Sequence, residues 1–155
     1  RMDFSQFDQR GRDEAGTPHP ILHPESLEPI VDPDTDKPCL VLVRGPTAPS
    51  VVRAEVVRSR AQMLNPLDPT NMALIEVHDY NVEVALPFIA GFENMTKADG
   101  SPFTEADAPY FLSMNMPRLE RSEDGTFFLG NTTFAQQIIN IVTAEKAKLG
   151  NAPAP

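Results

Sequence analysis

Three aspartates at alternate positions, Asp32, Asp34 and Asp36, are the first candidates for chemistry, because they resemble the beginning of a calcium-binding loop. Such a loop needs glycine at its sixth position and a bidentate glutamate at its twelfth. This chain has Lys37 and Val43 at those positions. We therefore interpret the three aspartates as an acidic turn in solvent and expect no metal there.

The histidines also fail to form a convincing metal site. His19 and His23 are four residues apart, and this spacing brings two side chains together only on a helix. The prolines around them prevent a helix. His78 is alone on a predicted helix, where we expect it at the surface or half-buried. The sequence therefore predicts no zinc site.

Nucleophilic catalysis has no better candidate. Cys39 is the only cysteine, and it lies in a predicted strand, where cysteine is usually a small buried apolar side chain. No serine lies in a Gly-x-Ser-x-Gly turn, and no glycine-rich phosphate loop is present. We therefore expect neither enzyme activity nor a cofactor. A lone cysteine also allows no disulfide framework, which favours a reducing compartment.

Charge and length narrow the class of protein further. The 155 residues include 13 Lys and Arg and 22 Asp and Glu, for a net charge of −9. Because phosphate binding depends on Lys and Arg, we expect no nucleic-acid partner. No apolar run reaches the roughly 20 residues that span a bilayer, so we expect no membrane partner and a location in the cytoplasm. The length predicts one domain, with or without an appended arm.

The charges fall into two blocks. Residues 44–62 contain four arginines (Arg44, Arg53, Arg58 and Arg60) and one acid, Glu55. Residues 25–36 contain five acids and no basic residue. Such blocks indicate either solvated faces or a docking surface for a protein partner.

Prolines and apolar runs define the N-terminal part. The chain has 16 prolines, about twice the usual share. They exclude a helix between Thr17 and Cys39, so we interpret residues 1–37 as an extended arm with short strand pieces. The aliphatic run at residues 37–44 predicts a strand that ends at Gly45 and pairs with the region of Ile21 or Ile30. We find no internal repeat.

Four helices broken by prolines are predicted next. Ser50 is expected to cap the first, which carries an apolar stripe of Val52, Val56 and Met63. Thr70 is expected to cap the second, and Pro87 to kink or divide it. The apolar segment 87–95 is expected in the core.

The two remaining helices have clear start signals. Thr104 and Asp107 fit a capping box for a short helix at about residues 105–115. Asn131 or Thr132 is expected to cap the last helix, whose apolar face includes Phe134 and Ile138. The sequence thus predicts an α+β fold: the proline-rich arm, a small antiparallel sheet or hairpin, and a helical bundle. Residues 38–150 form the compact domain, and residues 151–155 a disordered tail.

Several short segments occur in an order that resembles the tail-assembly-chaperone-like proteins of long-tailed bacteriophages and prophages. The resemblance extends from residue 2 to about residue 149 and is carried by residues 2–8 (MDFSQFD), 23–30, 40–45 (LVLVRG), 88–95 (FIAGFENM) and 99–104 (DGSPFT). Two departures fall near the end of the chain. Residues 144–149 lack the aromatic segment that often closes the family's proteins, and residues 122–130 form an inserted hairpin-like segment.

The resemblance implies a protein without enzyme activity that keeps the tape measure protein soluble until tail tube subunits polymerise around it. We expect an apolar helical partner on the second, third and last helices, with the arginines as a docking edge. The expected partner-binding residues are Arg53, Arg58, Arg60, Phe88, Phe92, Phe111, Met114, Phe134 and Ile138.

A structural virion protein is the alternative function. It would be a capsid cement or decoration subunit that contacts the major capsid protein, or a minor tail component. A proline-rich arm suits a small subunit that reaches across its neighbours, because the prolines reduce the entropy lost on ordering. The location would then be the virion instead of the host cytoplasm, and a homo-oligomer is compatible with either function.

Overall fold

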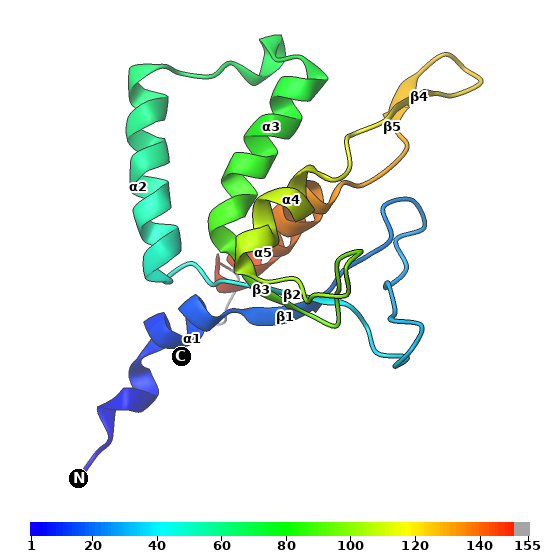
Figure 1. Cartoon of the computed structure of the whole chain (residues 1–155). Coiled ribbons are helices and arrows are strands. Elements are labelled where there is room, and N and C mark those ends of the chain that lie inside the picture. The colour runs from blue at the N-terminus through cyan, green and yellow to red at the C-terminus, as the bar shows by residue number, and fades with distance from the viewer. Residues whose placement is uncertain (151–155) are drawn as a thin grey trace.

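The computed structural model describes residues 1–150 and has an α+β fold. A three-stranded antiparallel sheet has the order β1-β2-β3, with β1 at Thr17–Pro20, β2 at Leu40–Val43 and β3 at Ile89–Glu93. Helices α3, α4 and α5 lie together on one side of this sheet (Figure 1). The sequence analysis therefore predicted the fold class correctly.

Strand β2 forms the centre of the sheet, as the aliphatic run predicted. Val41 and Val43 are buried while Leu40 and Leu42 are half-buried, which is the alternation of a strand with one core face. Leu40 pairs with Pro20 on one side and with Glu93 on the other, and Val43 pairs with Thr17 and Ile89. One end of the sheet therefore carries Thr17, Val43 and Ile89, and the opposite end carries Pro20, Leu40 and Glu93.

Two similar turns between β1 and β2 form what we call the turn unit, residues 21–39. Its centre is a closed ring of three backbone hydrogen bonds. The N–H of Ile21 donates to the carbonyl of Cys39 (3.0 Å), that of Ile30 to Ile21 (2.9 Å), and that of Cys39 to Ile30 (2.8 Å). The ring satisfies backbone groups that prolines leave without ordinary ladder partners.

The turn unit is an internal repeat of nine residues, so the expectation of no repeat was wrong. The two copies are ILHPESLEP (21–29) and IVDPDTDKP (30–38), and each is closed by the same two backbone hydrogen bonds. In the first copy the N–H of residue 23 donates to the carbonyl of residue 28, and that of residue 27 to residue 23. In the second copy the N–H of residue 32 donates to the carbonyl of residue 37, and that of residue 36 to residue 32. Leu27 and Asp36, at equivalent positions, have φ of 60° and 58°. The repeat escapes inspection because only Ile and two prolines are identical.

The N-terminal segment differs from the predicted extended arm. Ile21 is a buried core residue and Thr17–Pro20 belongs to the sheet, so the boundary at residue 37 falls inside the fold. Before the sheet, a 3₁₀ turn η1 (Phe4–Phe7) and a helix α1 (Gln9–Ala15) form where no helix was predicted. Asp8 caps α1 by accepting a hydrogen bond from the N–H of Gly11 (3.4 Å).

Helix α2 (Pro49–Leu64) was predicted, but its cap and its packing were not. Ala48 is its N-cap, because the hydroxyl of Ser50 instead donates to the carboxylate of Glu14. Val51 is the one fully buried side chain of this helix, all of which the structure describes. The predicted stripe of Val52, Val56 and Met63 is exposed.

Helix α3 (Leu74–Ala85) follows a short turn η2 (Pro69–Asn71), and Ala73 is its N-cap. Thr70 is part of η2, so it is not the predicted cap. Pro87 was expected to kink or divide this helix, and the structure shows that it divides it. The chain after Ala85 forms a turn η3 (Leu86–Phe88) and then strand β3, which the sequence analysis had not predicted.

The C-terminal elements follow their sequence signals closely. The capping box of Thr104 and Asp107 is present at η4 (Glu105–Asp107), which leads into α4 (Ala108–Ser113). Strands β4 (Leu119–Arg121) and β5 (Phe127–Leu129) form a hairpin that overlaps the expected segment 122–130 and begins three residues before it. Helix α5 (Phe134–Gly150) is capped by the hydroxyl of Thr133, which accepts from the N–H of Gln136 (3.1 Å), instead of by Asn131 or Thr132. The predicted tail, residues 151–155, lies outside the described residues.

The core lies between the sheet and α3, α4 and α5. Phe111 is its centre, stacked on Phe134 at 4.6 Å and meeting the edge of Phe92 at 5.0 Å between ring centroids. Buried aliphatic residues of β2, β3 and α5 surround these rings. Arg44 closes one end of the sheet, where its guanidinium donates to the carbonyls of Pro87 (3.1 Å) and Ile89 (3.0 Å).

Candidate partner-binding surfaces

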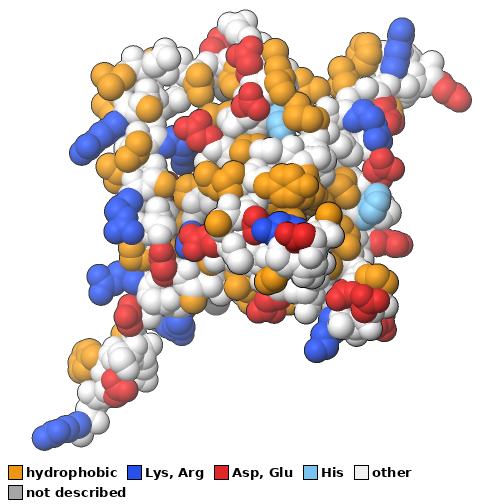
Figure 2. Space-filling model, viewed as in Figure 1, with side chains coloured by type: hydrophobic (Ala, Val, Ile, Leu, Met, Phe, Trp, Pro, Cys, Tyr) orange, Lys and Arg blue, Asp and Glu red, His pale blue; other side chains and the backbone are white. Residues whose placement is uncertain are grey.

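Helix α2, which we call the arginine helix, is the first surface. Apart from Val51, its large apolar side chains are exposed, with exposed fractions of 68% at Val57, 82% at Met63 and 87% at Leu64. It starts beside α1 and η3 and then extends away from the sheet (Figure 1). Orange apolar and blue basic side chains therefore alternate along that edge of the molecule (Figure 2). Exposed apolar side chains on this scale mark interaction sites.

The three predicted arginines differ in how much they are engaged within the chain. Arg53 and Arg60 are exposed. Arg58 is half-buried, and it donates to the hydroxyl of Tyr80 (3.3 Å) and lies 3.9 Å from the carboxylate of Glu55. Arg53 and Arg60 can thus meet a partner directly, while Arg58 also connects α2 to α3.

A cavity of about 360 Å³ separates α2 from α3. Ala54, Val57 and Ala61 line it on the arginine helix, and Val84 and Phe88 line it on the opposite side. A cavity of this size, lined by small and aliphatic side chains, has room for a few apolar side chains of a partner. Phe88 is buried, so it contributes the base of this cavity and not an exposed anchor.

The structure corrects the role of four predicted partner-binding residues. Phe88, Phe111, Phe134 and Ile138 are buried in the core, with 8% exposure or less. Their aromatic and aliphatic spacing was interpreted as a binding face, but the same spacing is produced by helices and strands that pack on each other. Phe92 is half-buried against Phe111, and Met114 is exposed.

Met114 belongs to a second surface, which we call the aromatic groove. It has a volume of about 780 Å³. Its floor is formed by core residues Phe103, Phe111 and Phe134, and the exposed side chains at its edge are Val31, Tyr110 and Met114. Charged side chains around it are Asp32, Asp34, Asp99 and Lys97. The groove is thus apolar inside and mainly acidic at its mouth.

The β4–β5 hairpin is the third exposed apolar element. Leu119, Phe127, Phe128 and Leu129 are each about half exposed or more. The hairpin projects beyond the helices (Figure 1). A two-stranded hairpin alone is marginally stable in water, so its base must be held by other contacts.

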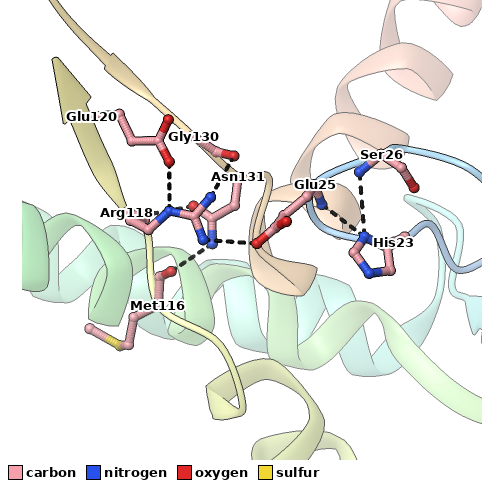
Figure 3. A network of polar contacts seen from close by, with 8 residues as sticks. All are labelled: His23, Glu25, Ser26, Met116, Arg118, Glu120, Gly130 and Asn131. Carbon is pink, nitrogen blue, oxygen red and sulfur yellow. Dashed lines mark hydrogen bonds and ion pairs between the residues drawn. The ribbon is translucent and has the colours of Figure 1, made fainter.

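Arg118 supplies those contacts, as Figure 3 shows. Its guanidinium bonds to the carboxylates of Glu25 and Glu120, both at 2.8 Å, and to the carbonyl of Gly130 (3.2 Å). Asn131 accepts from the N–H of Arg118 and donates to the carbonyl of Met116, both at 2.8 Å. The hydrogen bond and charge of Arg118 lower the pKa of Glu25. This network connects the hairpin to the turn unit and fixes its direction.

The residues considered for metal binding do not come together. No group of three His, Cys, Asp or Glu side chains within residues 1–150 is arranged to hold a metal ion. His19 lies in β1, while Nδ1 of His23 accepts from the N–H of Glu25 (3.1 Å). Asp32 accepts from the N–H of Asp34 (2.9 Å), as a turn residue. His78 is fully buried, which corrects the expected surface or half-buried position.

Cys39 is half-buried in the aromatic groove. Its thiol donates to the carbonyl of Asn94 (3.2 Å). Burial, with the charge of Asp32, raises the pKa of this thiol. The thiolate is the reactive form, so Cys39 has the properties of a poor nucleophile.

Comparison of the chain with models of known protein families, with curated protein sequences and with solved structures gave no match. Among the described helices, none is long and apolar enough to cross a lipid bilayer.

Proposed function

We propose that this chain is a tail-assembly-chaperone-like protein of a long-tailed bacteriophage or prophage. It binds and shields a helical tail protein, the tape measure protein, during virion assembly in the host cytoplasm, and it catalyses no reaction. The observation that carries the proposal is the arginine helix, whose exposed side chains are apolar and basic. The order of short motifs from residue 2 to about residue 149 supports the same class.

The proposed contact is a helix bound in a groove. Apolar residues of the partner helix lie between α2 and α3, against Val57, Ala61 and Val84. Acidic residues at the edge of the partner helix pair with Arg53 and Arg60. Burial of apolar surface supplies most of the affinity, and the arginines supply orientation and association rate. A long helical protein covered in this way is protected from aggregation until its final partners are available.

Charge reversal of Arg53, Arg58 and Arg60 to Glu tests the electrostatic part. We expect weaker binding of the tape measure protein in titration calorimetry, and a smaller dependence of affinity on salt, because the attraction is screened by ions. Arg53 and Arg60 are exposed, and exposed charges contribute little to folding, so their reversal should leave the unfolding midpoint nearly unchanged, whereas R58E also removes the hydrogen bond of half-buried Arg58 to Tyr80. R53E/R60E is the companion variant that leaves the Arg58–Tyr80 hydrogen bond intact.

A matched control separates local attraction from net charge. Reversal of Lys37, Arg121 and Lys148, all exposed and outside the arginine helix, changes the net charge by the same amount. This control should bind nearly as well as the unmodified chain. Equal binding by the arginine-helix variant and the control would contradict the assignment of the docking edge.

The apolar part is tested by V57D/M63D, which changes two exposed side chains and leaves the core intact. When this variant is produced together with the tape measure protein, we expect most of that protein in the insoluble fraction. If V57D/M63D, the arginine-reversal variant and the unmodified chain all keep the same fraction of the tape measure protein soluble, the proposed function is wrong.

A structural virion subunit is the second candidate function, favoured by the projecting N-terminal segment. Quantitative mass spectrometry of purified mature particles distinguishes the two. A chaperone is abundant in the infected-cell lysate and absent from the particle. A subunit is present in a near-integer ratio to the capsid or tail-tube protein.

A further inference from the structure

The first seven residues, which we call the aromatic arm, present two aromatic rings to solvent. Phe4 is 74% exposed and Phe7 is 62% exposed, and their ring centroids are 5.6 Å apart. The arm is an ordered 3₁₀ turn, because Asp3 accepts a hydrogen bond from the N–H of Ser5 (2.9 Å). Adjacent aromatic side chains held in one turn are arranged to enter an apolar site together.

Helix α1 fixes the point from which the arm starts. Asp13 accepts from the N–H of Thr47 (2.8 Å), and Glu14 accepts from the N–H of Ser50 (3.1 Å). Arg44 donates to the carbonyl of Glu14 (3.2 Å). These bonds hold α1 at the end of the sheet that carries Thr17, Val43 and Ile89, and the arm points away from the molecule (Figure 1).

The aromatic groove lies at the opposite end of the sheet. Its edge is built from the turn unit, which follows Pro20 and precedes Leu40, and from residues 94–99, which follow β3. The strand register places Pro20, Leu40 and Glu93 together at that end. Strand β1 therefore separates α1 from the groove, and the arm of one chain cannot fill the groove of the same chain.

The groove fits the arm in its chemistry. Exposed Tyr110 and Met114 at the edge, above a floor of phenylalanine rings, form a site of about 780 Å³ for aromatic side chains. The thioether of Met114 adapts to an aromatic ligand and makes favourable contacts with ring edges. Tyr110 already stacks on Phe103 at 6.2 Å, so a further ring can extend that stack.

The groove mouth is mainly acidic, and residues 1–12, which contain the arm, carry three arginines against two aspartates. The groove mouth carries Asp32, Asp34 and Asp99 against one cation, Lys97. Arg10 and Arg12 follow the arm and are exposed, so they meet the acidic mouth when the arm is inserted. Asp8 is 3.8 Å from Arg10 and caps α1, and Asp3 caps the arm itself.

We propose that the aromatic arm of one copy binds in the aromatic groove of a second copy of this chain. The two surfaces are different, so the contact is heterologous and joins copies head to tail. Each bound copy still presents a free arm or a free groove, which leads to rings or open chains. The proposal does not depend on the proposed function, because neither surface includes the arginine helix.

Analytical ultracentrifugation of the full chain, at concentrations up to about 1 mM, tests this contact. The unmodified chain should form larger species as its concentration rises. F4S/F7S removes the arm's rings, and Y110S/M114S removes the groove's exposed edge, so each variant should be monomeric. All four side chains are exposed, and circular dichroism confirms that both variants are folded.

A mixture of the two variants makes the test specific. The arm variant retains an intact groove and the groove variant retains an intact arm, so their mixture should give dimers and nothing larger. V56S/V57S removes exposed apolar side chains from the arginine helix, and this control should associate like the unmodified chain. Loss of association in this control alone, or a mixture that stays monomeric, would overturn the proposal.

Cys39 gives an independent readout inside the groove. Because it is the only cysteine, its alkylation rate reports on access to that site. In the unmodified chain the rate should fall as the protein concentration rises, and in F4S/F7S it should not. A rate that is independent of concentration in both proteins would show that the arm does not occupy the groove of a second copy.

Discussion

The turn unit has an irregular backbone but contributes to the core, whereas the arginine helix has a regular backbone but contributes little to the core. The turn unit contains four prolines in 19 residues and no helix, yet Ile21 is buried and the backbone groups at Ile21, Ile30 and Cys39 are paired. The arginine helix is regular over 16 residues, yet Val51 is its one buried side chain. Regular backbone structure and contribution to the core are therefore separate properties in this chain.

The cause of the difference is the source of the hydrogen bonds. A helix satisfies its interior backbone groups itself, so its side chains are left to pack or to face solvent. The turn unit depends on partners distant in sequence, such as Gln137 of α5. The turn unit is therefore suited to hold the fold together, and the arginine helix is suited to present a surface.

The largest expected effect comes from Arg44, which holds the end of the sheet from which the arginine helix starts. Its nearly buried guanidinium donates to the carbonyls of Glu14, Pro87 and Ile89 and to the carboxylate of Glu105. R44A leaves buried carbonyls unpaired, and we expect it to lower the free energy of unfolding by about 3 kcal/mol in urea titrations. R44K is the control.

R44K keeps the charge, but its three donors sit on one nitrogen and cannot span the acceptors that the five donors of the planar guanidinium reach. Its unfolding free energy should lie between those of R44A and the unmodified chain. Ordinary surface substitutions and small hydrogen-bond losses lower the free energy of unfolding by less than about 1 kcal/mol. If the loss in R44A lies in that range, Arg44 does not hold this end of the sheet together.

The second largest effect is expected from removing the hydrogen bonds that connect the turn unit to α5. The carbonyl of the Gln137 side chain accepts from the N–H of Leu22 (3.0 Å), and its amide donates to the carbonyl of Leu22 (2.8 Å). Q137A leaves both backbone groups without these partners at a buried site, so we expect a loss of about 2 kcal/mol in unfolding free energy.

The neighbouring Gln136 is the matched control, because it bonds only to other side chains from its amide group, Asn140 at 2.9 Å and Asn81 at 3.3 Å. Q136A should cost about 0.5 kcal/mol or less. Equal losses in the two variants would show that α5 does not anchor the turn unit.

Local sequence signals predicted the elements that depend on neighbouring residues. The aliphatic run at β2, the capping box at Thr104 and the hairpin after Leu119 are all determined within a few residues, and the structure confirms them. The turn repeat was missed because its two copies share only Ile and two prolines, and β3 was missed because its hydrogen bonds join it to β2, which is far away in the chain.

The exposure of the predicted partner-binding residues was predicted less well than the fold. The pattern at Phe111 and Phe134 shows that these residues share apolar faces, but it cannot show whether the protein itself covers them. The same limit applied to the predicted apolar stripe, whose Val52 and Val56 are exposed. Periodicity thus identifies an apolar face, and only the tertiary structure shows what covers it.

The third prediction compares two valines of the arginine helix. Val51 is fully buried and Val57 is 68% exposed. V51A should lower the free energy of unfolding by about 2 kcal/mol, from lost apolar burial and a cavity, while V57A should change it by less than about 0.5 kcal/mol. Thermal or urea unfolding measures both. Similar losses would mean that the helix packs along its whole length.

The smallest expected effect concerns the turn of the β4–β5 hairpin. An aspartate holds this turn, as Asp32 does in the second turn of the turn unit. Asp124 accepts from the hydroxyl of Ser122, and from the hydroxyl (2.7 Å) and N–H (3.0 Å) of Thr126. These hydrogen bonds lower the pKa of Asp124 from 3.8 to about 2. Because the folded turn favours the carboxylate, its support is complete above pH 3.8 and is lost as the pH falls through about 2.

A carbon-detected NMR titration of the Asp124 carboxyl group measures this directly, and its midpoint should lie near pH 2. S122A/T126V removes the two hydroxyl donors but keeps the N–H of Thr126, so the pKa should rise toward its ordinary value without reaching it. An unchanged pKa in this variant would show that the hydroxyls do not hold the turn. The turn would then be held by its backbone hydrogen bonds, from the N–H of Ser122 to the carbonyl of Thr126 (2.8 Å) and from the N–H of Gly125 to the carbonyl of Ser122 (3.0 Å), and the hairpin as a whole by the Arg118 network at its base.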